Sequence, residues 1–269
     1  MNILLLGDIV GPSGRKAIFQ KLPNLIEKKK IDFVILNGEN AADPGVGITK
    51  KIVKEFLEVG ADVITTGNHV WDQKEAMEFI TTEKRLLRPQ NLIEGSPGNG
   101  YGVYYAKNKK KVAVVNLMGN IFMKKCEDVF QEAKKIIQMI QLKKDADFIV
   151  IDMHGEITSE KMAIGYLFDG KATLVVGTHT HVPTSDHRIM EKGTAYQTDV
   201  GMCGDYNSVI GMNRDNSLKK FLKDPSAKKH YPALGEATIS GLMVVADDKT
   251  GLANKVEPII LGGSLENRI

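Results

Sequence analysis

The sequence has few cysteines, no long apolar run and no N-terminal leader pattern. Its two cysteines, Cys126 and Cys203, are too few for a disulfide framework and lie in no metal-binding spacing. No apolar run approaches the roughly 20 residues that a membrane-spanning helix needs. The chain opens on a strand pattern, without a basic region or a cleavage site. We therefore expect free thiols, no membrane partner and a soluble protein in the reducing cytoplasm.

Net charge and internal repetition are also scarce. The formal charge is only +3 over 269 residues, which gives no strong signal for a nucleic-acid partner. No repeat, low-complexity linker or shift in composition marks a domain boundary. A hydrophobic content of 42% with 26% charged residues is typical of a globular protein. We expect one domain over residues 1–269.

Apolar runs alternate with amphipathic segments along the first eighty residues. Runs at 2–6, 31–36 and 62–65 predict strands, and a helical pattern follows each of them. Such β-α units favour a parallel sheet and an α/β fold. Further strands are expected at 101–106, 112–117, 148–153, 173–176, 187–190, 194–198, 239–245 and 256–261, and helices at 17–26, 49–60, 76–80, 129–142 and 159–167.

Two segments rich in turn-forming residues interrupt this pattern. Residues 85–100 contain several Pro, Gly and Asn residues and predict a long surface loop that covers the site as a lid. Residues 200–216 are glycine-rich and polar, and we expect them to line the rim of the site.

Polar side chains follow five of the predicted strands, at the point where each strand ends. Because the carboxyl ends of parallel strands meet at one edge of a sheet, these groups are expected to converge there. Carboxylate, amide and imidazole groups together suit divalent transition metals, and four of the six histidines belong to the set. The pattern predicts a shared dinuclear metal site made from Asp8, Glu39, Asn40, Asn68, His69, His154, His179 and His181.

Two of these histidines form an H-x-H pair after the apolar run 173–176. If the backbone there is extended, the side chains of His179 and His181 point to the same side. Two neutral imidazoles in one cavity would suit a metal ion, whereas in isolation the pair reads equally well as two surface histidines in a turn.

The order of these motifs resembles a known superfamily. G-D at the first strand end, then G-N-H, H-G and G-T-H-T-H, look like the calcineurin-like metallophosphoesterases. The resemblance implies an αββα sandwich, in which helices flank two mixed sheets and the site lies at the carboxyl ends of the strands.

Two departures from the common superfamily pattern point to one branch. Ile9 and Val10 follow Asp8 where D-x-H is usual, and Asn37-Gly38-Glu39-Asn40 replaces G-D. Together with G-N-H-x-W-D and H-T-H-V-P-T-x-D, these changes are similar to the YmdB-type 2′,3′-cyclic-nucleotide 2′-phosphodiesterases. That family implies a homo-oligomer that acts on a cyclic nucleotide or another small phosphodiester.

The resemblance also implies a division of the ligands between two metal ions. Glu39 bridges both ions. Iron is the metal that the family implies, and the mixed oxygen and nitrogen ligands also suit manganese or zinc. The first ion is held by Asp8, Glu39, Asn40 and His181, and the second is completed by Asn68, His154 and His179.

The expected chemistry follows from such a pair of ions. Two metals can clamp phosphate oxygens and activate a bridging water as hydroxide, while His69 protonates the leaving O2′ as general acid. A 3′-phosphate would result. A phosphomonoesterase acting on nucleotides or proteins would use the same ligands. A regulatory protein that binds a nucleotide without turnover is a third reading, although it needs no general acid.

Three further residues allow two readings each. Asp72 either orients His69 or caps the next helix, and Trp71 either stacks on a base or packs in the core. Arg214 either contacts a phosphate or lies in a solvated loop. His187 and His230 fall outside every motif and are expected at the surface.

Overall fold

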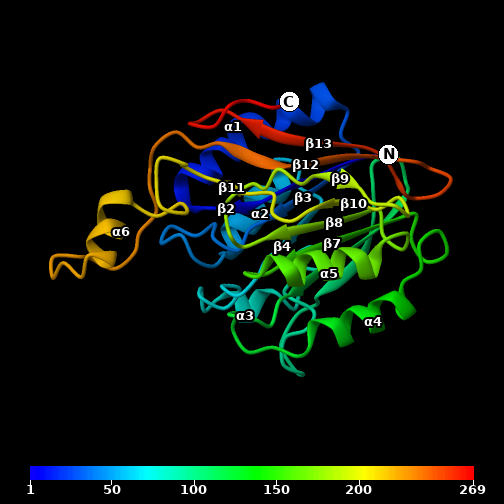
Figure 1. Ribbon diagram of the computed structural model, residues 1–269, viewed down its shortest axis with the longest axis horizontal. Helices are drawn as coiled ribbons and strands as arrows, with labels where there is room; N and C mark the ends of the chain where they lie inside the picture. Colours follow the sequence, from blue (N-terminus) through cyan, green and yellow to red (C-terminus); the bar gives the residue numbers. More distant parts are fainter.

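Two β-sheets packed face to face form the centre of the molecule (Figure 1). The computed structural model describes all residues, 1–269. The first sheet has five strands, in the order β13 (Ala253–Leu261), β12 (Ile239–Ala246), β1 (Asn2–Leu6), β3 (Phe33–Asn37) and β4 (Val63–Thr65). In this sheet β1, β3 and β4 are parallel, and β12 runs antiparallel to both β1 and β13.

The second sheet has six strands and is mixed as well. Its order is β5 (Tyr101–Tyr105), β6 (Lys111–Met118), β7 (Phe148–His154), β8 (Leu174–Thr178), β10 (Ala195–Gln197) and β9 (Arg188–Ile189). Strands β6, β7, β8 and β10 are parallel. The expected hairpins β5–β6 and β9–β10 are both present as antiparallel pairs at the two edges.

Helices cover the outer face of each sheet and produce four layers. α1 (Gly11–Lys29), α2 (Lys50–Glu58) and the short α3 (Ala76–Phe79) pack on the first sheet, and α4 (Val129–Met139) and α5 (Thr158–Phe168) pack on the second. Polar caps begin two of them. The Thr49 hydroxyl accepts the Ile52 N–H at the start of α2, and the Asp128 carboxylate accepts two N–H groups at the start of α4. The expected sandwich of two mixed sheets flanked by helices is confirmed.

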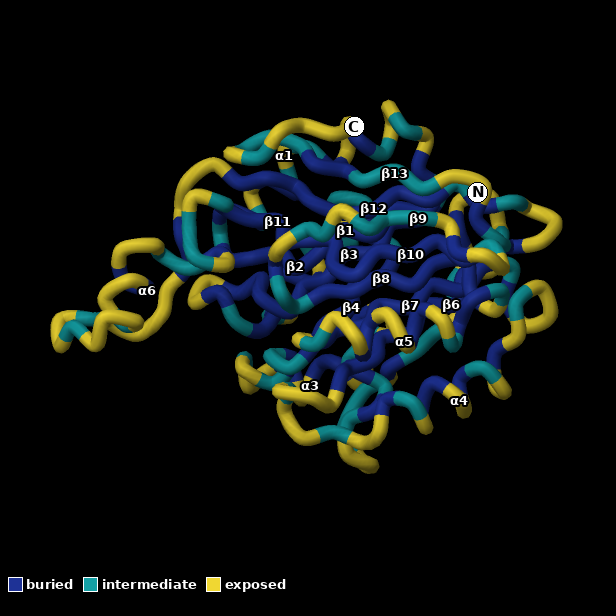
Figure 2. The backbone as a smooth tube through the Cα atoms, in the orientation of Figure 1, coloured by how far each residue is buried: buried dark blue, intermediate teal, exposed yellow.

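The core lies in three layers, and β1 shows why its sequence is apolar at almost every position. Ile3 and Leu5 point into the cluster between the two sheets, whereas Leu4 and Leu6 point into the cluster beneath α1 and α2. Side chains alternate along a strand, so a strand buried on both faces reads as a continuous apolar run. The dark interior of Figure 2 follows these central strands.

Beyond β1 the chain forms a third, two-stranded sheet that extends toward the site. β2 (Asp8–Ile9) pairs in parallel with β11 (Met202–Cys203). The segment 85–100 is tied to both large sheets, because Leu86 bridges to Ile64 and the Gln90 N–H donates to the Asn116 carbonyl. A lid function for this segment stays a prediction.

The rim segment 200–216 is followed by a helix that the sequence did not predict. α6 (Arg214–Phe221) begins where the Asn213 side chain accepts the Asn216 N–H. It lies on an arm that projects from the body (Figures 1 and 2). Its apolar residues Leu218 and Phe221 are exposed, so no buried apolar stripe marks the helix in the sequence.

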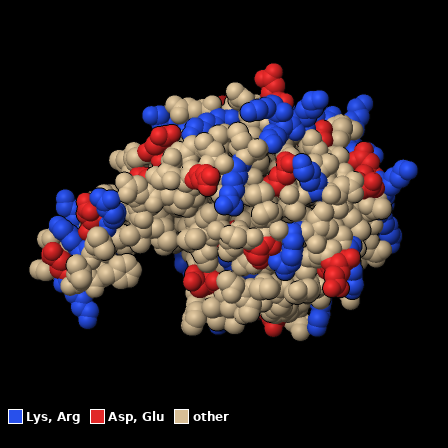
Figure 3. Space-filling model, turned by 45° about the horizontal axis from the view of Figure 1, so that its top comes forward, with Lys and Arg blue, Asp and Glu red and all other residues tan.

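Basic and acidic side chains are interspersed on the face drawn in Figure 3, and several lysines lie on the arm. No helix combines the length and the apolar composition that crossing a bilayer requires.

Candidate metal centre

Four of the predicted ligands meet where the strands of the two sheets end. His154 is the last residue of β7 and lies at the centre of the group. Its Nε2 is 3.0 Å from Oε1 of Glu39, 3.1 Å from Oδ1 of Asn68 and 3.1 Å from Nδ1 of His179. Ligand atoms of Glu39, His154 and His179 lie within 4.8 Å of one another, close enough to share one metal ion.

The remaining predicted ligands border this group. Asp8 Oδ1 lies 3.7 Å from Nδ1 of His154 and 3.9 Å from Nε2 of His181. Asp8 Oδ1 and Asn40 Oδ1 are buried oxygens without a hydrogen-bond partner. Since a buried acceptor without a partner is costly, both oxygens fit a site that binds cations.

The H-x-H pair reaches the site by a different route from the one expected. β8 ends at Thr178, and both histidines follow it in the left-handed backbone region, with φ of 95° at His179 and 66° at His181. The expectation of extended backbone is therefore wrong. Such conformations are uncommon for residues other than glycine and persist where surrounding contacts impose them.

Two buried carboxylates impose this backbone conformation. The His179 N–H donates to Oδ2 of Asp8 at 3.1 Å. The N–H and the hydroxyl of Thr180 both donate to Oδ2 of Asp199, at 3.1 and 2.8 Å. Asp199 itself forms a buried ion pair of 2.7 Å with Lys161 of α5.

Each site histidine also uses one ring nitrogen on a partner outside the cluster. Nδ1 of His154 lies 2.9 Å from the Thr178 hydroxyl, and Nδ1 of His181 lies 2.8 Å from the carbonyl of Ile210. Nε2 of His179 is 3.1 Å from the carboxylate of Glu156. Metal-ligating histidines usually donate their second N–H in this way, which leaves the other nitrogen free for the ion.

Charges in the cluster shift the pKa values of its members. Burial raises the pKa of Asp8, although His181 and His154 oppose the shift. Burial also disfavours the charge on Glu39, but His154 outweighs it and lowers the Glu39 pKa to about 2. Burial and the neighbouring His154 lower the pKa of His179 to about 3, so its imidazole is neutral, as a metal ligand must be.

His69 lies beside the cluster and contacts it through the backbone. Its N–H donates to Oε2 of Glu39 at 3.2 Å. Its ring Nδ1 is 2.7 Å from Oδ2 of Asp72, and Lys124 lies 3.1 Å from the other oxygen of that carboxylate. The residue at the start of α3 is Glu75, so Asp72 contacts His69 and does not cap that helix.

The other residues with two readings lie outside the cluster. Trp71 packs against the core beneath the helices of the first sheet. The Arg214 guanidinium donates to Asn207 and pairs with Asp215. His187 and His230 contact none of the predicted ligands by hydrogen bond or ion pair.

Sequence reasoning missed several residues that support the site. Asp152 is one of them, and a carboxylate inside the otherwise apolar run 148–153 was the available signal. Glu156, Thr178, Lys161 and Asp199 gave no such signal, because each role depends on a partner distant in the sequence.

Gly67 lets the backbone pass close to the cluster. A Cβ atom at this position would collide with the Glu39 carboxylate and the His154 imidazole. We expect Gly67→Ala to lose metal binding, measured as metal content after purification. Gly155→Ala is the matched control, because its added Cβ would meet only ordinary contacts of 3.6 Å. Equal metal content in the two variants would contradict this prediction.

The Lys161–Asp199 pair predicts a large effect on stability. Both side chains are buried, at 0% and 1% exposure. Removing one partner of a buried pair leaves an uncompensated charge, so Lys161→Met should lower the free energy of unfolding by about 3–5 kcal/mol. Urea denaturation in a metal chelator measures this. Lys135→Met, which breaks an exposed pair with Glu132, should change it little, and similar losses in both variants would count against the prediction.

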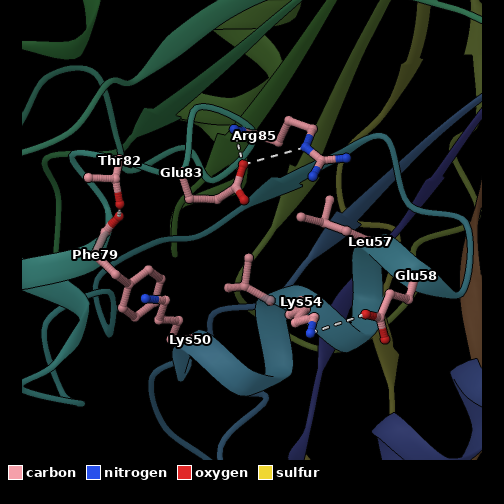
Figure 4. A pocket seen from close by; sticks show the side chains of 9 residues that line it. Lys50, Lys54, Leu57, Glu58, Phe79, Thr82, Glu83 and Arg85 are labelled. Carbon is pink, nitrogen blue, oxygen red and sulfur yellow. Dashed lines mark hydrogen bonds and ion pairs between the residues drawn. The ribbon is translucent and has the colours of Figure 1, made fainter.

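One cavity of about 490 Å³ lies away from this cluster, between α2 and residues 79–85 (Figure 4). Its cations are largely neutralised by its own acids, since Lys54 pairs with Glu58 and Arg85 pairs with Glu83. It shares no residue with the metal-ligand set.

Comparisons with known proteins agree with the geometry. The model of the family described as YmdB-like protein matches residues 4–259. A 2′,3′-cyclic-nucleotide 2′-phosphodiesterase of Bacillus subtilis is 46% identical over 261 residues, covering 97% of both chains.

Two solved structures share the whole fold. A phosphatase from Mycoplasma pneumoniae has a TM-score of 0.89 and 36% identity, covering 97% of this chain and 93% of its own. A Thermus thermophilus protein of undescribed activity has a TM-score of 0.87 and 35% identity, covering 97% and 98%. The chain therefore belongs to the YmdB-like family of metallophosphoesterases.

Proposed function

We propose that this protein is a metal-dependent phosphodiesterase that hydrolyses 2′,3′-cyclic nucleotides to 3′-phosphates. The observation that carries the proposal is the convergence of Asp8 and Glu39, buried and ion-paired only with histidines, on three imidazoles. The B. subtilis relative supports the substrate class by its similarity over nearly the full length.

The cluster would hold two cations. Asp8, Glu39, Asn40 and His181 would bind the first, and Glu39 would bridge to a second held by Asn68, His154 and His179. Iron is the proposed metal, and manganese or zinc would also suit these ligands. When bound, such a pair of ions polarises phosphate oxygens and lowers the pKa of water toward neutrality.

The protein's own groups would then orient the substrate and supply a proton. His69 would donate it to O2′ as the 2′ ester bond breaks. Because Nδ1 of His69 is engaged by Asp72, Nε2 is the nitrogen available for this transfer. Lys124 beside Asp72 would keep that carboxylate ionised, and the pKa of Asp72 is lowered by His69 and Lys124 despite its partial burial.

Steady-state assays with 2′,3′-cAMP, 3′,5′-cAMP and a panel of phosphomonoesters test the proposal. Turnover of 2′,3′-cAMP to the 3′-monophosphate is the expected result. No turnover of 2′,3′-cAMP after metal reconstitution would refute it. Preferential monoester hydrolysis would favour the second candidate, a phosphomonoesterase, which the M. pneumoniae phosphatase supports by its similar fold. Nucleotide binding without turnover would indicate a regulatory protein.

We further propose a single domain over residues 1–269, with segment 85–100 covering the site and segment 200–216 forming its rim, in a cytoplasmic homo-oligomer. Size-exclusion chromatography with light scattering measures the oligomeric state.

A further inference from the structure

Asp152 is a buried carboxylate that no cation neutralises. It lies on β7, two residues before His154, and has 0% exposure. It forms no ion pair with a lysine or arginine. Its partners are neutral donors: the Asn37 amide at 3.0 Å, the Thr65 hydroxyl at 2.5 Å and the Thr178 hydroxyl at 2.7 Å.

These donors come from both sheets. Asn37 and Thr65 end β3 and β4 of the first sheet, whereas Thr178 ends β8 of the second. Asp152 therefore links the two sheets directly beneath the metal ligands. Because a buried carboxylate requires its hydrogen bonds, this link fixes how the two strand ends face each other.

One arm of the link leads to His154. The Thr178 hydroxyl has a single proton, and the Asp152 carboxylate can only accept it. The Thr178 oxygen must then accept from Nδ1–H of His154 at 2.9 Å. Nε2 of His154 is thereby directed at Glu39 and Asn68.

The other arm leads to Glu39. Asn37 donates to Asp152 through its amide nitrogen, so its amide oxygen faces the opposite way. That oxygen accepts the Glu39 N–H at 3.1 Å. The turn that presents the Glu39 carboxylate is thus held by the same carboxylate that orients His154.

We propose that Asp152 is a positioning residue, which aligns the metal ligands supplied by the two sheets through Thr178 and Asn37. The inference rests on the proposed metal-dependent function. Asp152 touches neither substrate nor cation. Its contribution is to hold the Nδ1–H of His154 and the N–H of Glu39, so that Nε2 and the carboxylate converge.

Thr178→Val tests the arm that leads to His154. It removes the hydroxyl while conserving volume, and the outer hydrogen bond of a ligating histidine is typically worth about 10–100-fold in metal affinity. We expect a loss of this size in Mn²⁺ or Zn²⁺ affinity, measured by chelator competition. Thr178→Ser should restore affinity, and saturating metal should restore most of kcat in Thr178→Val with KM unchanged.

Thr65→Val is the matched control. It also removes a hydroxyl from Asp152, but Thr65 contacts no ligand side chain by hydrogen bond, so metal affinity should stay close to that of the unaltered protein. Equal losses in Thr65→Val and Thr178→Val would reduce Asp152 to a purely structural role and overturn the proposal. Unchanged affinity in Thr178→Val would overturn it as well.

Asp152→Asn provides an independent measurement if Thr178→Val folds poorly. Its amide group cannot accept from all three donors, so metal affinity should fall while far-UV circular dichroism stays native. Retained affinity would contradict the proposal. Metal binding by the unaltered protein without phosphodiester hydrolysis would instead refute the proposed function and leave the alignment role standing.

Discussion

Glu39→Ala is expected to abolish binding of both metal ions. Its carboxylate is buried and lies 3.0 Å from Nε2 of His154, and it is the one proposed ligand shared by the two ions. Without it, neither set of ligands keeps enough negative charge to bind a dication. Because the ions supply several kcal/mol of transition-state stabilisation, kcat/KM should fall on the order of 10³-fold or more.

Metal analysis of freshly purified protein measures this loss directly. Glu39→Gln separates charge from shape, since its side-chain oxygen can still accept the N–H of His69. We expect it to lose metal almost as completely. Asp8→Ala and His181→Ala should empty mainly the first site and retain about half of the metal. Two ions retained in Glu39→Ala would show that Glu39 is not the bridge.

The sequence predicted those parts of the molecule whose pattern is local. β1 and β7 are buried on both faces and therefore appear as unbroken apolar runs. The order of polar residues at the strand ends was enough to identify the ligands that the structure brings together around His154.

Features that depend on distant partners could not be predicted in this way. The left-handed backbone at His179 is imposed by contacts from Asp8, 171 residues away in the chain. β12 lies beside β1 although more than 200 residues separate them. Thr178 reads as an ordinary strand residue until its two hydrogen bonds are known.

The arm shows a third limit. α6 begins at a recognisable polar cap, Asn213, but its apolar side chains face solvent. Amphipathic periodicity reports burial, so a helix that buries no apolar stripe leaves no periodic signal.

His69→Ala is expected to keep both metal ions and to lose most activity. The His69 ring contacts Asp72 and none of the proposed ligand side chains, so its removal leaves the ligand set intact. A positioned general acid typically contributes about 10²–10⁴-fold, and we expect kcat on 2′,3′-cAMP to fall within that range. Metal content equal to that of the unaltered protein is the accompanying result.

The leaving group provides the decisive comparison. A ribose alkoxide needs a proton as it departs, whereas a nitrophenolate leaves readily without one. His69→Ala should therefore lose far less activity on bis(4-nitrophenyl) phosphate than on 2′,3′-cAMP, because only the second reaction depends on the acid. Asp72→Asn, which keeps the imidazole but weakens its anchor, should show the same selectivity with a smaller loss. Equal losses on both substrates, together with loss of metal, would make His69 a ligand and leave the protonation of O2′ to another group.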